Sequence, residues 1–269
     1  MRAACVQMCS GDDVSANLAV AGCRLEEAAA AGARLAVLPE NFSFMHPDDG
    51  VKRRVAAEIV PAVVLPFLAE AAARHAMFVV GGSVLLTGAG GKLRNASPVF
   101  GPDGSWLANY DKIHLFDADF SDEHYQESAL IEAGAAPVAL DVDDWRLGLS
   151  ICYDLRFPEL YRRYAADGCQ ILSIPASFAS TTGADHWQVL LRARAIENQA
   201  YVLAPAQAGT HPGARKTWGH SLIVDPWGTV VAQADGGPDV EGTLIVAELD
   251  RAHLERVRRQ LPVLNHRRD

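Results

Sequence analysis

The sequence lacks the short patterns that usually bind metal ions. Neither a Cys-x-x-Cys pair nor a His-Glu-x-x-His sequence occurs in its 269 residues, and the nine histidines are dispersed. Zinc sites in particular draw their ligands from such close spacings. We therefore expect a protein that requires no metal and no other cofactor.

Positive charge is also scarce. The 24 lysines and arginines are outnumbered by 33 acidic residues, which gives a formal net charge of -9. The basic clusters at 52–54 and 256–259 are short and lie among acidic residues, so they are interpreted as solvated helix faces. Because nucleic-acid-binding proteins usually carry a basic stripe, this charge balance predicts no nucleic-acid partner.

Long apolar runs and paired cysteines are missing as well. No run of about 18 consecutive apolar residues, the length needed to cross a bilayer, occurs, and the apolar run after Arg2 ends at residues 10–13, too early for a signal peptide. An odd number of cysteines is scattered along a chain that is long enough to fold without disulfides. They are Cys5, Cys9, Cys23, Cys152 and Cys169. We therefore expect a reduced, cytoplasmic protein with no membrane partner.

Hydrophobic residues make up 49% of the chain and alternate in strand and helix periods. The predicted order is strand–helix units, an antiparallel meander, then strand–helix units and a second meander. This repeat favours one α/β domain over residues 1–269, with two related sheets facing each other and helices on the outer faces. The first half has predicted strands at 3–8, 34–38, 78–86, 95–100 and 106–110, with helices at 15–31 and 51–74, the latter broken near Pro61 and Pro66. The second half has predicted strands at 138–140, 146–151, 171–175, 201–206, 221–224, 229–234 and 243–248, with helices ending near 166 and spanning 185–199.

The most informative segment is Leu147–Glu159, in which an apolar strand delivers Cys152 and then turns polar. Asp154 is available as a helix cap, and Pro158 fits a first helical turn. Cys152 would then lie at a strand-to-helix junction, where backbone N–H groups favour a thiolate and can stabilise an oxyanion. The alternative interpretation is a buried structural cysteine that behaves as a small hydrophobic residue.

A cysteine nucleophile needs a base and a group that stabilises the oxyanion. Glu40 follows the aliphatic run 35–38, and Lys112 follows the strand that begins near Trp106, so both are expected at strand ends, where α/β active sites gather. Taken singly, each is more typical of a surface residue. A Cys–His hydrolase that uses His114 or His220 is an alternative, although no histidine has a diagnostic sequence context.

Together, these segments resemble the nitrilase, or carbon–nitrogen hydrolase, superfamily, whose signature is a Glu-Lys-Cys triad. The resemblance covers essentially the whole chain, and three separated matches in the right order are far more specific than one. The matching segments are 38–41, 110–117, 126–128, 151–159, 181–183, 191–198 and 219–228.

The resemblance implies a four-layer α-β-β-α sandwich that associates at least as a homodimer. It also implies that Glu40 is the general base and Cys152 the nucleophile that forms a thioester. Lys112 and the backbone N–H of Tyr153 would stabilise the oxyanion, and Glu127 would orient the lysine. A surface position is the alternative for Glu127.

Residues 152–159 and 219–228 resemble the Nit branch of this superfamily, which contains deaminated glutathione amidase and ω-amidase. Members of that branch hydrolyse amides of α-keto dicarboxylic acids, so the expected reaction converts a small carboxylate-bearing amide to an acid and ammonia. Arg156 can bind a carboxylate through two parallel hydrogen bonds, and Thr182 can add a hydroxyl group. Alternatively, Arg156 forms an ion pair with Asp154 or Glu159.

Several activities are compatible with the same triad. Deaminated glutathione is the favoured substrate type, with the ω-amidase substrates α-ketoglutaramate and α-ketosuccinamate as the next choice. Hydrolysis of nitriles or of N-carbamoyl amides uses the same three residues. A catalytically silent binding protein on this fold would be expected to have lost a triad residue, and none is lost here.

Overall fold

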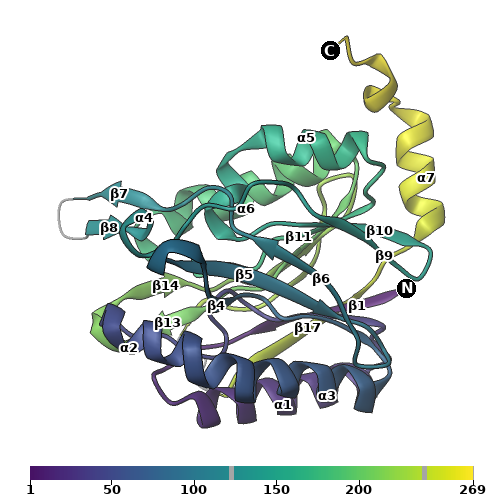
Figure 1. Cartoon of the computed structure of the whole chain (residues 1–269). Coiled ribbons are helices and arrows are strands. Elements are labelled where there is room, and N and C mark those ends of the chain that lie inside the picture. Colours follow the sequence, from purple (N-terminus) through teal and green to yellow (C-terminus); the bar gives the residue numbers. More distant parts are fainter. Residues whose placement is uncertain (121–123, 238–240, 269) are drawn as a thin grey trace.

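Two mixed β-sheets stack face to face, and helices cover the outer face of each sheet (Figure 1). The structure is a computed structural model that describes residues 1–120, 124–237 and 241–268. Helices α1 and α3 lie along one side of the molecule and α5 and α6 along the other, so the layers are helix, sheet, sheet, helix. The predicted α-β-β-α sandwich is therefore confirmed.

The first sheet has seven strands in the order β17-β1-β2-β3-β5-β4, with β6 paired to β5. Its centre is parallel, because β1 pairs with β2 and β2 with β3 in parallel register, whereas β4, β5 and β6 form the predicted antiparallel meander. The strand bounds are β1 Arg2–Gln7, β2 Leu35–Val37, β3 Phe78–Val80, β4 Val84–Thr87, β5 Leu93–Phe100, β6 Trp106–Asp111 and β17 Thr243–Glu248.

The second sheet has six strands in the order β16-β15-β12-β11-β10-β9. Strands β10, β11 and β12 are parallel, and the outer strands pair antiparallel. Two short hairpins, β7–β8 and β13–β14, stand apart from both sheets. The bounds are β7 Asp117–Asp119, β8 His124–Gln126, β9 Ala139–Val142, β10 Trp145–Leu149, β11 Ile171–Ser173, β12 Tyr201–Ala204, β13 Ala208–Thr210, β14 Lys216–Trp218, β15 Leu222–Val224 and β16 Val230–Gln233.

Alternation along β1 explains how the layers are held together. Ala3 and Cys5 pack in a cluster with Leu147 and Leu149 of the second sheet, while Ala4 and Val6 pack with the apolar side chains of α1 and α3. Side chains of a strand point alternately to its two faces, so one apolar strand contributes to two buried layers. The helices are α1 Val14–Ala30, α2 Asp49–Arg54, α3 Leu65–His75, α4 Glu127–Leu130, α5 Pro158–Ala166, α6 Ser180–Asn198 and α7 Arg251–Gln260.

The predicted helix 51–74 is continuous rather than broken. A π-helical segment, Val55–Val64, joins α2 to α3 and contains Pro61, whose missing N–H the wider helix accommodates. Among the described residues, the span Asp49–His75 is the one helix long and apolar enough to cross a membrane, and 33% of its most apolar stretch is buried. Buried core helices have the same length and composition, and Val60, Val64 and Leu68 pack beneath the first sheet, so this is weak evidence for a membrane span.

Other differences from the predicted elements have physical causes. The predicted strand 78–86 is two strands, because Gly82 has φ +54° and turns the chain between them. Strand β17 closes the first sheet against β1 rather than extending the second meander. Helix α6 begins five residues earlier than predicted, and α7 contains the basic cluster 256–259 that was interpreted as a helix face, although its bounds were not predicted. Residues 238–240, between the predicted strands 229–234 and 243–248, lie outside the described residues.

Candidate active site

Glu40 lies just beyond the carboxyl end of β2 and is 2% exposed. The turn that carries it packs against the β3–β4 connection: Ser83 donates its N–H to the Pro39 carbonyl at 3.3 Å, and the N–H of Asn41 donates to the Ser83 hydroxyl at 3.1 Å. A Cβ at Gly82 would lie 2.0 Å from the same Pro39 carbonyl oxygen, so only glycine fits there. The fold thus fixes Glu40 at the edge of the first sheet.

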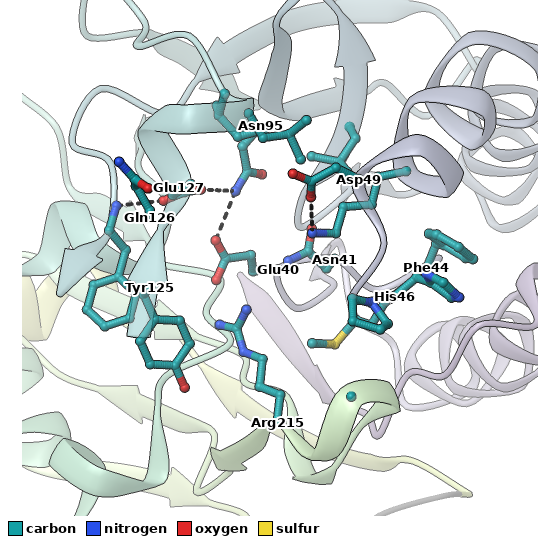
Figure 2. Close-up of a pocket in the computed structure, with 18 of the residues that line it drawn as sticks. Glu40, Asn41, Phe44, His46, Asp49, Asn95, Tyr125, Gln126, Glu127 and Arg215 are labelled. Carbon is teal, nitrogen blue, oxygen red and sulfur yellow. Dashed lines mark hydrogen bonds and ion pairs between the residues drawn. The ribbon is translucent and has the colours of Figure 1, made fainter. Parts of the chain in front are cut away.

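Lys112 follows β6 and is also 2% exposed. Its Nζ donates to Glu40 Oε1 at 3.0 Å and to Glu127 Oε2 at 2.9 Å. Asn95 of β5 donates to both Glu40 and Glu127, at 3.0 and 3.1 Å, and the Phe116 N–H donates to Glu127 Oε2 at 2.7 Å. The lysine is therefore held between two carboxylates whose own oxygens are oriented by further donors. Figure 2 shows Asn95 linked to both Glu40 and Glu127.

Cys152 follows β10 and opens a 3-10 turn, Cys152–Arg156, after which α5 begins at Pro158. Its φ of +47° is unusual for a residue with a side chain and is found at functional turns. The Cys152 N–H donates to the Pro175 carbonyl at 2.9 Å, and the thiol is hydrogen-bonded to Glu40. The structure thus brings Glu40, Lys112, Glu127 and Cys152 together, as the sequence predicted.

The protonation states of the three central groups follow from burial and charge. Burial raises the pKa of Glu40, but the positive charges of Lys112 and Arg215 outweigh it, and the pKa lies below the ordinary 4.5. Burial lowers the pKa of Lys112, yet the charges of Glu127 and Glu40 raise it above its ordinary value. Burial and the charge of Glu40 raise the pKa of Cys152 well above its ordinary value. At neutral pH the site therefore holds a carboxylate base, an ammonium group and a protonated thiol.

Asp154 holds the turn Cys152–Arg156 in place through its hydrogen bonds. It is fully buried, accepts hydrogen bonds from the Ile151 N–H at 2.9 Å and the Tyr110 hydroxyl at 2.7 Å, and contacts His114 Nδ1 at 2.7 Å. These contacts tie the Lys112 strand to the Cys152 turn. They involve both oxygens of Asp154, and the alternative ion pair between Asp154 and Arg156 does not form among the described residues.

Neither histidine considered as an alternative base lies at the nucleophile. His114 is stacked on Phe157 with ring centroids 3.7 Å apart, and its Nδ1 faces Asp154. His220 is stacked on Trp218 and contacts the carbonyl of that residue. Among the described residues, neither lines a pocket that contains Cys152. The geometry favours Glu40 as the base.

Two pockets meet at Cys152. The larger one encloses about 420 Å³ and contains Glu40, Lys112 and Glu127 in its wall. The smaller one encloses about 10 Å³, enough for one water-sized group, and is bordered by Tyr153, Arg156 and Thr182 as well as Ser177 and Phe178. All three predicted substrate-binding residues therefore lie on one side of the nucleophile.

Arg156 is oriented by a hydroxyl group, a histidine ring and two aromatic rings. Its Nη2 donates to Thr182 Oγ1 at 3.2 Å, its Nη1 contacts His186 at 3.2 Å, and its guanidinium lies over the rings of Tyr153 and Phe178. Within the described part of the chain it makes no ion pair with Glu159 or any other carboxylate, so the alternative interpretation of Arg156 as a partner of Asp154 or Glu159 is wrong.

Sequence reasoning missed three residues of the site. Asn95 is an amide in an otherwise mainly apolar strand, which is a usable signal. Ser177 donates its N–H to Glu40 Oε2 at 2.8 Å, and Arg215 donates to the Ser177 hydroxyl at 2.8 Å. Ser177 and Arg215 lie in connections without a distinctive pattern, so nothing in the sequence pointed to them.

Clusters of three or more metal-binding side chains are absent from residues 1–120, 124–237 and 241–268. The site offers a thiol hydrogen-bonded to a carboxylate base, a cation for an oxyanion and a carboxylate that can carry a proton. The fold and these groups define a thiol hydrolase on an α-β-β-α sandwich.

Comparison with known proteins identifies the family. The carbon–nitrogen hydrolase model matches residues 2–259. The chain is 42% identical to a deaminated glutathione amidase from Synechocystis sp., over 98% of this chain and 97% of that protein. It is 38% identical to an omega-amidase from Danio rerio, over 100% and 95%. The crystal structure of the C. elegans NitFhit protein superposes with a TM-score of 0.92 at 36% identity, over 99% of this chain and 65% of that one.

The chain therefore belongs to the carbon–nitrogen hydrolase, or nitrilase, family. It is an amidase of that family, a hydrolase of carbon–nitrogen bonds other than peptide bonds. This class excludes the alternative of a catalytically silent binding protein.

Proposed function

We propose that the protein hydrolyses amides whose acyl group ends in an α-keto carboxylate, with deaminated glutathione as the leading substrate. The observation that carries the proposal is Arg156 beside Thr182, a guanidinium without a carboxylate partner among the described residues, in the small pocket next to Cys152. The pocket admits one water-sized group, so it can take a single carboxylate oxygen at the end of an acyl chain. A guanidinium and a hydroxyl are well suited to bind it.

The proposed reaction uses the groups in their resting protonation states. Glu40 takes the proton of the Cys152 thiol as the sulfur attacks the amide carbon, and Lys112 and the Tyr153 N–H stabilise the resulting oxyanion. The carbon–nitrogen bond then breaks while Glu40 returns its proton to the departing nitrogen. Water, deprotonated by Glu40, hydrolyses the thioester and releases the acid and the free thiol.

The second product depends on the amide. Deaminated glutathione is an α-keto acid joined through its side-chain amide to cysteinylglycine, so its hydrolysis yields 2-oxoglutarate and cysteinylglycine. Ammonia, the product expected from the sequence, is released only from a primary amide such as α-ketoglutaramate. Similarity to both a deaminated glutathione amidase and an omega-amidase supports the shared acyl group and leaves these two amides as the leading choices.

A substrate panel tests the proposal. Release of 2-oxoglutarate is measured from deaminated glutathione and from α-ketoglutaramate. Release of ammonia is measured from a nitrile and an N-carbamoyl amide. Cys152→Ala is the inactive control. Arg156→Gln should raise KM for the 2-oxoglutaryl amides roughly ten- to a hundredfold, as expected for one lost charge-assisted contact. Turnover confined to the nitrile or the N-carbamoyl amide would refute the proposal.

A further inference from the structure

The two pockets at Cys152 are lined by different groups of the proposed reaction. Cys152 and Phe116 line both pockets, whereas Glu40 lines only the larger one and Arg156 only the smaller one. In the proposed reaction the acyl group stays on the sulfur, and the nitrogen departs toward the group that protonates it. Because that group is Glu40, the amine portion of the substrate lies in the larger pocket, which we call the amine chamber.

The amine chamber is far larger than ammonia requires. On the measure that gives it about 420 Å³, a water-sized molecule needs only about 10–15 Å³. Apolar side chains, Phe44, Met45, Leu85 and Leu130, form part of its wall. Its size and mixed lining fit a substituted amine of several bonded heavy atoms.

The charges of the chamber identify the chemistry of that amine. Lys112 is balanced by Glu40 and Glu127, and Lys52 by Asp49 at 2.9 Å. Arg215 is different: within the described ranges it forms no ion pair with a carboxylate. Its charge acts on Glu40 at longer range, and its guanidinium can still pair with a bound carboxylate.

The hydrogen bonds of Arg215 leave capacity for a ligand. Its Nη2 donates to the carbonyl and the hydroxyl of Ser177 at 3.0 and 2.8 Å, and its guanidinium lies over the Tyr125 ring. Its Nε is buried and, among the described residues, has no hydrogen-bond partner. Figure 2 shows the side chain directed into the pocket toward Glu40. A buried donor without a partner favours a ligand that accepts a hydrogen bond.

We propose that the amine chamber binds a carboxylate-bearing amine, such as a dipeptide, through Arg215. The site then recognises a carboxylate on each side of the scissile amide, with Arg156 on the acyl side and Arg215 on the amine side. This inference rests on the proposed function, and it favours deaminated glutathione, which has both carboxylates, over α-ketoglutaramate, which has one.

Three substrates with the same 2-oxoglutaryl group test the inference. Their amine portions are cysteinylglycine, cysteinylglycinamide, in which the terminal carboxylate is a neutral amide, and ammonia. For the wild type we expect kcat/KM to be roughly ten- to a hundredfold higher with cysteinylglycine than with cysteinylglycinamide, the range for one charge-assisted hydrogen-bond pair. The readout is the ratio of these two values.

Two arginine variants separate binding from positioning. Arg215→Gln should bring the ratio close to one, and Arg215→Lys, which keeps the charge but loses the planar fork, should retain an intermediate ratio. Arg156→Gln, the matched control on the other side of Cys152, should lower kcat/KM for all three substrates and leave the ratio intact. If Arg215 serves only to position Ser177, its variants lower all three values equally.

The outcomes distinguish the two proposals. A wild-type ratio near one, or a ratio that Arg215→Gln leaves unchanged, overturns the amine-chamber inference while the proposed acyl specificity stands. Absence of 2-oxoglutarate release from all three substrates overturns the proposed function and the inference with it. A kcat/KM ratio that falls toward one only in the Arg215 variants supports both the proposed function and the amine-chamber inference.

Discussion

Replacing Lys112 with methionine tests whether the catalytic lysine is also a structural counter-ion. Its Nζ lies 3.0 Å from Glu40 and 2.9 Å from Glu127, and the side chains of Lys112, Glu40 and Glu127 are 2%, 3% and 17% exposed. Methionine keeps much of the volume but leaves both carboxylates without their cation. Removing one partner of a buried ion pair costs about 3–5 kcal/mol of unfolding free energy. In a chain of this size that loss lowers Tm on the order of 10 °C.

The assay is thermal and urea unfolding of Lys112→Met beside the wild type at several pH values. The loss should be largest near pH 7 and should shrink toward pH 5. In the wild type the lowered pKa of Glu40 contributes stability above pH 4.5 that is lost as the pH falls through the folded-state pKa. In the variant, burial without Lys112 raises the pKa of Glu40, so protonation stabilises the folded state as the pH falls.

Two further variants sharpen the result. Lys52→Met removes a lysine whose ion-pair partner, Asp49, is exposed to solvent, and it should cost less than about 1 kcal/mol. Adding Glu127→Gln to Lys112→Met should recover part of the lost stability and none of the activity. A Lys112→Met protein that unfolds at the wild-type temperature at every pH would refute the reasoning.

Three further outcomes are expected. The acid limb of the kcat/KM profile should lie below pH 4.5, because the lowered pKa keeps Glu40 in its basic form; a limb near pH 6.5 would indicate a histidine base instead. His114→Gln and His220→Gln should each reduce kcat by less than the hundredfold or more typical of a lost general base, measured with the substrate that the panel identifies. Gly82→Ala should lower the unfolding free energy by about 1–3 kcal/mol and reduce kcat, because its Cβ meets the Pro39 carbonyl and displaces Glu40; unchanged urea unfolding would contradict the close approach.

The sequence predicted those parts of the site that end strands. Glu40, Lys112 and Cys152 each follow an apolar run, and local periodicity is enough to place such residues at a sheet edge. The same reasoning recovered most strands of both sheets. It misjudged residues 78–86, because a period-2 pattern does not reveal that Gly82 folds the chain back at a positive φ.

The parts that sequence could not predict depend on long-range packing. Strand β17 joins β1 across nearly the whole chain length, and Arg215, beside the separate β13–β14 hairpin, acts on Glu40 of the first half of the chain only in the folded protein. The sequence also could not predict the hydrogen bond between Arg156 and Thr182. Asp154 is closer to Arg156 in sequence, but it accepts hydrogen bonds from Ile151 and Tyr110 instead. Local patterns identify reactive residues, and the fold decides which charges remain available for substrate.

The most direct test of the account is to trap the acyl-enzyme. Wild-type protein mixed with deaminated glutathione is quenched in acid, and intact and peptide mass spectrometry then locate any adduct. The account predicts a 2-oxoglutaryl group on Cys152, formed more slowly in Glu40→Gln and absent from Cys152→Ala. Turnover that survives in Cys152→Ala, or an adduct on one of the other four cysteines, would contradict it.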